Sequence, residues 1–98
     1  MKKTYFTLVG TGYRFGSGFL KPGMKVYLEK EPDNRYDREA IRVTLPGLGT
    51  IGYVANSINT VKGESCSAGR LGCKMGKKAK ARVKYFTDKG IICVLINK

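Results

Sequence analysis

The cations are the residues of this chain with the most evident chemistry. Nineteen Lys and Arg against seven Asp and Glu give a formal net charge of +12. A net charge of magnitude about 2–8 is enough to keep a small domain soluble. Residues 62–98 carry ten basic and two acidic residues, and residues 1–61 carry nine and five. Such a field attracts polyanions. The charge favours nucleic acid as the partner over a membrane surface; a purely solubilising charge is the simpler alternative.

Cations alternate with small apolar residues along one predicted strand. Alternation places them on one face, about 6.6 Å apart, because a strand rises about 3.3 Å per residue. Such a row suits a phosphate backbone; the alternative is a solvated strand edge on which Lys prevents aggregation. We interpret the row, with one arginine from the preceding segment, as phosphate contacts. These residues are Lys78, Lys80, Arg82, Lys84 and Arg70.

Exposed aromatic rings would be the second ingredient of single-strand recognition, because any base can stack on a ring. The candidates are Tyr13 and Phe15 in a glycine-rich loop, together with Tyr36 and Tyr53. The alternative for each is an ordinary core or rim aromatic. Tyr36 lies in a polar turn between charged residues, and it is the least suited of the four to a core.

Residues that could carry catalysis are sparse. The sequence has no His, the commonest general base and metal ligand. The cysteines offer no Cys-x2-Cys pair and too few ligands for a tetrahedral zinc site. An acidic cluster could hold a divalent cation in a nuclease, although Asp is also a common turn residue. This cluster is Glu31, Asp33, Asp37 and Glu39. We expect no catalytic residue, metal, cofactor or small-molecule substrate.

Six short stretches rich in β-branched and aromatic residues must position these side chains. Turn signals of Gly, Pro, Asn and Asp separate them, which predicts strands. Val26 and Leu28 are expected to face inward, and Gly23 and Gly90 to adopt left-handed turn conformations. Short helical turns are expected over residues 56–61 and 67–71, the second stopped by Gly72. The predicted strands are residues 4–9, 24–30, 40–44, 50–54, 79–86 and 91–96.

This pattern predicts one all-β domain over residues 1–98, a small six-stranded OB-like or SH3-like barrel with one or two short helical turns. No stretch is long and apolar enough for a transmembrane helix. The apolar residues after the charged residues 1–3 are too few for a secretory signal. We therefore expect a cytoplasmic protein.

Residues 28–43, LEKEPDNRYDREAIRV, resemble the signature of the HIRAN domain. That signature is an acidic residue and Pro, then Asn, Tyr-Asp and an Ala-Ile-x-Val strand. Two flanking elements match in order, VGTGY at residues 9–13 and IGYV at residues 51–54. The match covers roughly residues 5–55. The remainder, including SAGR at residues 67–70, looks like the tail of bacterial stand-alone members.

The resemblance implies an OB-like barrel that binds single-stranded DNA by its free 3′-hydroxyl end, in DNA repair or replication-fork processing. By position, Tyr13 and Tyr36 would stack on terminal bases, and Asp37 would accept a hydrogen bond from the 3′-hydroxyl. Asn34 would shape this pocket, and Tyr53 would line it. A carboxylate beside the last sugar accepts a hydroxyl donor and repels a 3′-phosphate. A helicase or nuclease would be the partner protein.

Two positions differ from a eukaryotic fork-remodelling member of that family. Gly12 stands where the relative has Arg, so one phosphate contact is missing, and Tyr53 occupies the position of a His. The alternative function is a non-catalytic interaction module that docks an acidic partner or recruits a helicase or nuclease. That alternative predicts no saturable oligonucleotide binding beyond that of any polycation.

Overall fold

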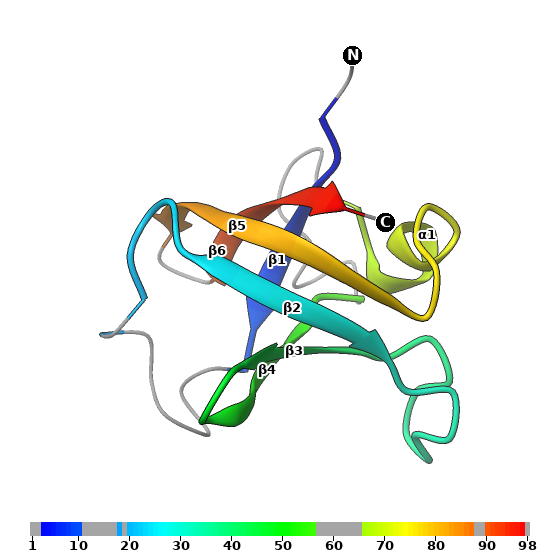
Figure 1. Ribbon diagram of the computed structural model, residues 1–98. Coiled ribbons are helices and arrows are strands. Elements are labelled where there is room, and N and C mark those ends of the chain that lie inside the picture. Colours follow the sequence, from blue (N-terminus) through cyan, green and yellow to red (C-terminus); the bar gives the residue numbers. More distant parts are fainter. Residues whose placement is uncertain (1–2, 11–17, 19, 57–65, 88–89, 98) are drawn as a thin grey trace.

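Six strands form a closed antiparallel barrel in the order β1-β4-β3-β2-β5-β6 (Figure 1). The computed structural model describes residues 3–10, 18, 20–56, 66–87 and 90–97. The prediction of an all-β, six-stranded barrel is therefore confirmed. The strands are β1 Tyr5–Val9, β2 Lys25–Lys30, β3 Ile41–Leu45, β4 Gly49–Val54, β5 Lys78–Thr87 and β6 Gly90–Asn97.

The alternation of the strands fills the barrel with apolar side chains. Successive residues of a strand face opposite sides, so every second side chain points inward. In β5 the inward positions hold small residues, which leaves room for larger ones on the facing strands. β6 is buried on both faces from Ile91 to Val94, which matches its nearly continuous apolar sequence. The core includes Phe6, Leu8, Val26, Leu28, Ile41, Val43, Ile51, Ala79, Ala81, Val83 and Cys93.

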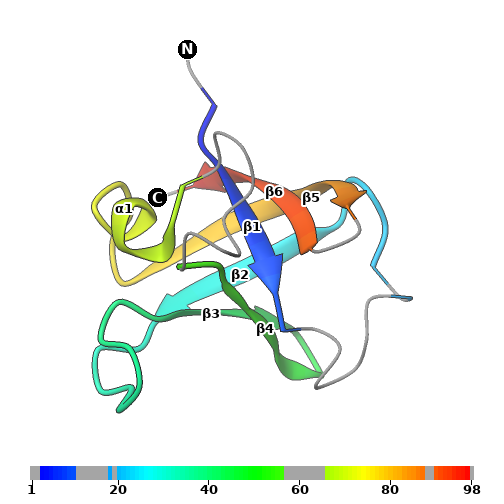
Figure 2. The ribbon, with the colours of Figure 1, turned by 180° about the vertical axis from the view of Figure 1, so that it is seen from behind.

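The barrel has no free strand edge in its ladder. β1 pairs with both β4 and β6, and β5 pairs with both β2 and β6. β1 and β2 consequently cross on opposite sides of the barrel, as the view from behind shows (Figure 2). Closure satisfies the backbone groups of every strand by pairing.

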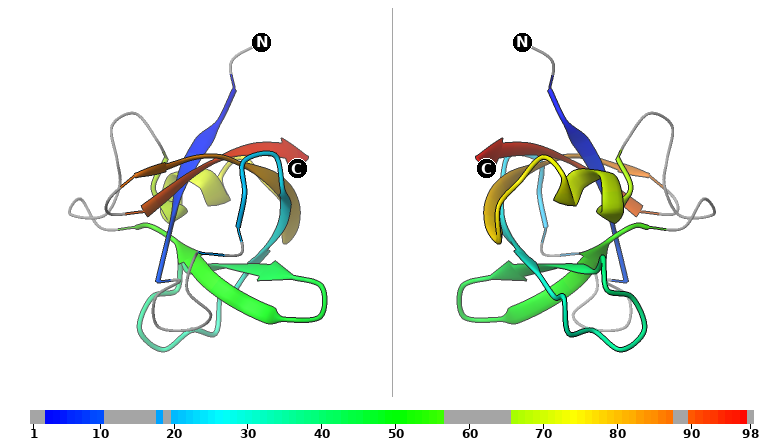
Figure 3. Two further views of the ribbon diagram at one scale, coloured as in Figure 1. Left: turned by 90° about the vertical axis from the view of Figure 1, so that its left-hand side faces the viewer. Right: turned by 90° about the vertical axis from the view of Figure 1, so that its right-hand side faces the viewer.

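The short helix α1, Ala68–Gly72, lies at one end of the barrel (Figure 3). Its Ala68 and Leu71 side chains are buried in the core, and Ser67 caps it by accepting a hydrogen bond from Arg70 N. The prediction of a helical turn here is confirmed, but Gly72 belongs to the helix, and Cys73 ends it in a right-handed conformation. The other predicted turn, residues 56–61, lies outside the described residues except for Asn56. Within the described ranges, no helix has the length and apolarity to cross a membrane.

Left-handed conformations were predicted for two glycines, and the structure confirms this for one of them and not for the other. Gly23 has a φ of 93° in the turn before β2, as expected. Gly90 does not have a positive φ; it begins β6 opposite Thr87. A Cβ atom added there would lie 2.7 Å from Thr7 Cγ2. Glycine is thus required at this position by the close approach of β1 and not by the turn.

The cysteines are all free thiols in the structure. Cys93 is buried in the barrel, and this burial raises the pKa of its thiol to about 12. A thiol that stays protonated at neutral pH is a poor nucleophile and metal ligand. Cys93 therefore acts as a small apolar core residue.

Candidate nucleic-acid interface

The loop between β2 and β3, residues 31–40, projects from the barrel beside α1 (Figures 1 and 2). Its backbone closes on itself, since Glu31 N donates to Ala40 O at 2.8 Å and Ala40 N donates to Asp37 O at 3.1 Å. The first bond continues the pairing of β2 with β3 beyond Lys30 and Ile41, and the second closes a turn within the loop. The loop that carries the HIRAN-like motif therefore has a fixed base on the barrel.

Asn34 organises this loop through three side-chain hydrogen bonds. Its Oδ1 accepts from Tyr36 N at 2.9 Å and from Asp37 N at 3.1 Å, and its Nδ2 donates to Glu31 Oε1 at 2.9 Å. Asn favours such turns because its short side chain can bond the backbone that follows it. Asn34 therefore fixes the backbone of the two residues predicted to meet the DNA end.

Replacing Asn34 with alanine is expected to lower the free energy of unfolding by roughly 1–2 kcal/mol, because three partly exposed hydrogen bonds are lost. Urea denaturation followed by circular dichroism measures this change. Asp33→Ala is the matched control, since Asp33 is its exposed neighbour in the same loop. Equal stability losses in the two variants would show that Asn34 does not organise the loop.

Tyr53 joins this network from β4. Its hydroxyl donates to Glu31 Oε1 at 3.0 Å, the same oxygen that accepts from Asn34 Nδ2. The structure therefore links Tyr53 and Asn34 through one carboxylate. Tyr53 is half-buried and its hydroxyl is engaged within the protein.

Asp37 is held by hydrogen bonds to both carboxylate oxygens. Oδ1 accepts from Glu39 N at 2.8 Å, and Oδ2 accepts from Asn56 Nδ2 at 2.9 Å. Asn56 is itself fixed, because its Oδ1 accepts from Gly69 N in α1 at 2.9 Å. An ionised carboxylate has about four acceptor positions, so Asp37 keeps capacity for a hydroxyl donor. The sequence did not identify Asn56 as a partner of Asp37.

The structure describes only some of the aromatic residues predicted to stack on bases. Tyr36 is 91% exposed, so its ring is available to a base. Tyr13 and Phe15 lie outside the described residues, as does Gly12. Asn34, Tyr36 and Asp37 thus lie in one loop with Tyr53 bonded against it, and the assignment of these residues and Tyr13 to a pocket for a DNA end stays a prediction.

The basic row runs along the outer face of β5. Its cations are exposed and the residues between them are buried, as the alternation predicts. Because β5 pairs on both sides, with β2 and β6, the interpretation of the row as a solvated strand edge is wrong. The row instead crosses the middle of a sheet face and leads away from the end that holds α1 (Figure 1).

The cations of the row are not equivalent. Lys78 Nζ lies 3.9 Å from Glu29 Oε2, and Arg82 Nη1 donates to Gly23 O at 2.9 Å. Among the described residues, Lys80 and Lys84 have no carboxylate partner, which leaves their charges open to an anionic ligand. Arg70 is exposed in α1 and lies apart from the row, at the end of the barrel.

A transverse set of side chains connects the row with the loop site. The strand registers align Lys78 with Glu29, Glu29 with Arg42, and Arg42 with Tyr53. Arg42 donates to Glu29 through Nε at 2.9 Å and also through Nη2. This hydrogen bond lowers the pKa of Glu29, so the ion pair persists at neutral pH. The two predicted sites thus belong to one continuous outer face.

The acidic cluster proposed for a metal divides into two parts. Glu31 interacts with Asn34 and Tyr53, whereas Asp37 and Glu39 meet at Asn56. In the part of the chain that the structure describes, no group of three or more His, Cys, Asp or Glu side chains could hold a metal ion. Glu31, Asp37 and Glu39 instead make hydrogen bonds that hold the loop and its surroundings.

Tyr27 is a surface aromatic that the search for stacking residues missed. It points outward from the middle of β2, between the inward Val26 and Leu28. The alternation of β2 already predicted that it lies on the outer face. The missing signal was the pairing of β2 with β5, which places Tyr27 directly opposite Lys80.

One of three comparisons with known proteins finds a match. The family model of the HIRAN domain matches residues 1–88 of the 98-residue chain. No curated protein and no solved structure matches the chain. HIRAN domains are nucleic-acid-binding modules and are generally non-catalytic. With nearly its whole length matched, the chain belongs to the HIRAN domain family.

Proposed function

We propose that this HIRAN domain binds single-stranded DNA and prefers a free 3′-hydroxyl end. The observation that carries the proposal is an exposed ring beside a fixed carboxylate: Tyr36 is 91% exposed, and the Asp37 side chain next to it is held by Glu39 N and Asn56. The ring would stack on the terminal base while the carboxylate accepts the 3′-hydroxyl proton. Tyr13 would supply a second ring.

The phosphates would follow the basic face. Lys80 and Lys84 offer charges without a carboxylate partner among the described residues, and Arg82 offers a guanidinium held in place by Gly23 O. Lys78 and Arg70 would add further contacts. In this proposal the domain is a cytoplasmic module of bacterial DNA repair or replication-fork processing, and a separate helicase or nuclease supplies the catalysis.

Fluorescence anisotropy with labelled single strands that end in a 3′-hydroxyl or a 3′-phosphate tests the proposal at two salt concentrations. We expect tighter binding of the hydroxyl end at both concentrations, because a carboxylate disfavours the phosphate. RNA strands of the same sequence test the choice of sugar. Equal binding of both ends that disappears at high salt would leave only a basic surface. The interaction module for an acidic partner would then be the better assignment.

The double substitution Lys80→Ala and Lys84→Ala is expected to weaken every oligonucleotide alike. The slope of log K against log salt concentration should fall by roughly 1.4, since each single-strand phosphate contact contributes about 0.7. The ratio between the two ends should not change. Lys21→Ala with Lys74→Ala is the control, because it removes the same charge from exposed positions outside the row. Equal slopes in both double variants would contradict the assignment of the row.

A further inference from the structure

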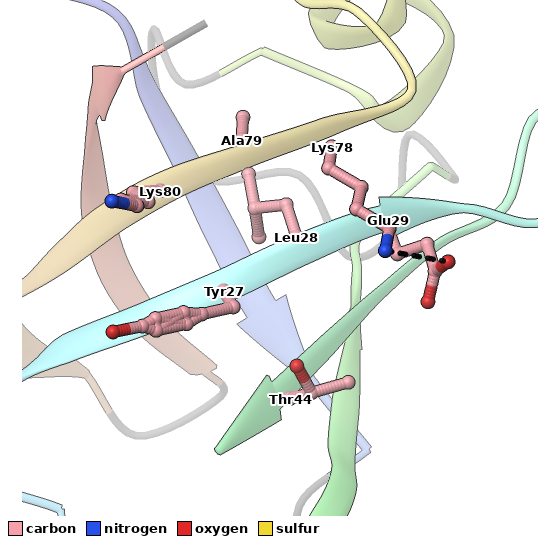
Figure 4. Close-up of a pocket in the computed structure, with 7 residues that line it drawn as sticks. All are labelled: Tyr27, Leu28, Glu29, Thr44, Lys78, Ala79 and Lys80. Atoms are coloured by element: carbon pink, nitrogen blue, oxygen red, sulfur yellow. Dashed lines mark ion pairs between the residues drawn. The ribbon is translucent and has the colours of Figure 1, made fainter. Parts of the chain in front are cut away.

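The outer face of β2 and β5 contains a hollow separate from the proposed end site. Its volume is about 390 Å³, within the range of roughly 300–1,000 Å³ that is usual for ligand pockets. Tyr27 and Glu29 of β2, Thr44 of β3, and Lys78 and Lys80 of β5 line it (Figure 4). No residue of the loop over positions 31–40 contributes to it.

Tyr27 offers this hollow an aromatic ring. The side chain is half-buried, and the strand registers place it between Lys80 and Thr44. Its hydroxyl makes no hydrogen bond to any residue that the structure describes. The hydroxyl of a buried tyrosine usually has a hydrogen-bond partner within the protein. Tyr27 therefore does not have the contacts of a purely structural tyrosine. The ring is therefore suited to contact a ligand that enters the hollow.

The charges around the ring are asymmetric. On one side Lys78 pairs with Glu29, with 3.9 Å between Nζ and Oε2, which largely neutralises that rim. On the other side Lys80 and the Tyr27 hydroxyl point the same way (Figure 4), and the next paired positions are Lys25 and Arg82. The hollow therefore has the Tyr27 ring and Lys80 on this side, and Lys25 and Arg82 follow beyond it on the same outer face of β2 and β5.

Arg82 is held in position for an anion. Its Nη1 donates to Gly23 O at 2.9 Å, and a guanidinium has five N–H donors in all. The remaining donors are free to bind a phosphate, and the bond to the backbone reduces the entropy lost when they do. Rings interleaved with cations are the common arrangement of surfaces that bind single-stranded nucleic acid.

We infer that Tyr27 is the stacking platform of an internal nucleotide subsite for single-stranded DNA. A base stacks on the Tyr27 ring, and Lys80, Lys25 and Arg82 bind the phosphates on either side of it. The subsite rests on the proposed binding of single-stranded DNA, but it requires no free end. The cations beside the ring complement the negative charge of a phosphodiester chain, so a nucleic-acid strand is the ligand that fits this surface.

A tryptophan placed at the platform tests the stacking directly. The chain has no Trp, so Tyr27→Trp introduces a unique fluorophore. We expect quenching by a circular single-stranded oligonucleotide, which has no 3′ end. An abasic strand of equal length and charge should quench far less. Tyr85→Trp, at an exposed position further along β5, is the matched control and should respond weakly to both. Equal responses of Tyr27→Trp to the two ligands, or no response, would overturn the inference.

The affinity of the circular strand provides the second measurement. Tyr27→Ala should weaken it at least fivefold, the lower end of what loss of one base–aromatic stack causes. Tyr27→Phe keeps the ring and should bind within twofold of the unmodified protein. Binding of the abasic strand should not change in either variant. An unchanged affinity of Tyr27→Ala for the circular strand would refute the platform.

The two proposals fail in distinguishable ways. If 3′-hydroxyl and 3′-phosphate strands bind equally while the circular strand still quenches Tyr27→Trp, end selectivity is wrong and the internal subsite stands. If the 3′-hydroxyl end is preferred but the circular strand does not quench, only the subsite is wrong. If no single strand binds saturably, both proposals are wrong.

Discussion

Replacing Asp37 with alanine is expected to abolish the preference for a 3′-hydroxyl over a 3′-phosphate end, while the affinity for circular single strands, which have no 3′ end, changes little. The carboxylate contributes one charge-assisted hydrogen bond to the hydroxyl and repels the phosphate. Such a bond is worth roughly 1.5–3 kcal/mol, which corresponds to about 10- to 150-fold in affinity. The ratio of the two dissociation constants, measured by anisotropy, should fall to about one.

Two variants separate the charge of Asp37 from its position. Asp37→Asn keeps the shape and removes the charge, so the 3′-phosphate should gain affinity. Asn56→Ala keeps the charge but deletes the hydrogen bond to Oδ2, so the preference should be reduced without being lost. A preference that survives in Asp37→Ala would assign end recognition to groups other than this carboxylate.

The sequence predicted the strands because their alternation is local information. In β2 and β5, apolar residues alternate with polar ones, and the burial of Val26, Leu28, Ala79 and Ala81 follows this alternation. The predicted strand limits differ from the observed ones by one residue at most ends. The same alternation placed the basic row on the outer face, which the structure confirms.

The predictions that needed long-range contacts were the ones that sequence reasoning missed. Asp37 and Asn56 are 19 positions apart and meet only because the barrel brings β4 beside the loop. The local sequence predicts a turn conformation for Gly90. Its tight contact with Thr7 cannot be predicted locally, because it depends on the pairing of β1 with β6. Local patterns define which face a residue occupies; they do not define which strand lies beside it.

Replacing Phe6 with alanine is expected to cost roughly 3–5 kcal/mol of unfolding free energy, the largest stability loss of the substitutions considered. Phe6 is fully buried in β1, opposite Cys93 of β6, and its backbone forms an isolated parallel β-bridge with Cys66. A cavity in so small a core cannot be filled by the short side chains of β5. Since the total unfolding free energy of a small domain is about 5–15 kcal/mol, the urea concentration at the midpoint should fall sharply. The dependence of the unfolding free energy on urea concentration should change little.

Phe86→Ala is the matched control for this loss, because Phe86 is 41% exposed near the end of β5; it should cost about 1 kcal/mol or less. The pair also separates scaffold effects from contact effects in binding. In Phe6→Ala the affinities for 3′-hydroxyl, 3′-phosphate and circular strands should fall by one common factor, set by the folded fraction. In Asp37→Ala the affinities for the 3′-hydroxyl and 3′-phosphate strands should change in opposite directions, while the circular strand binds as before. In Tyr27→Ala all three strands should weaken alike, while the abasic strand, which weakens with the others in Phe6→Ala, should not change. Comparable stability losses in Phe6→Ala and Phe86→Ala would contradict a core centred on β1.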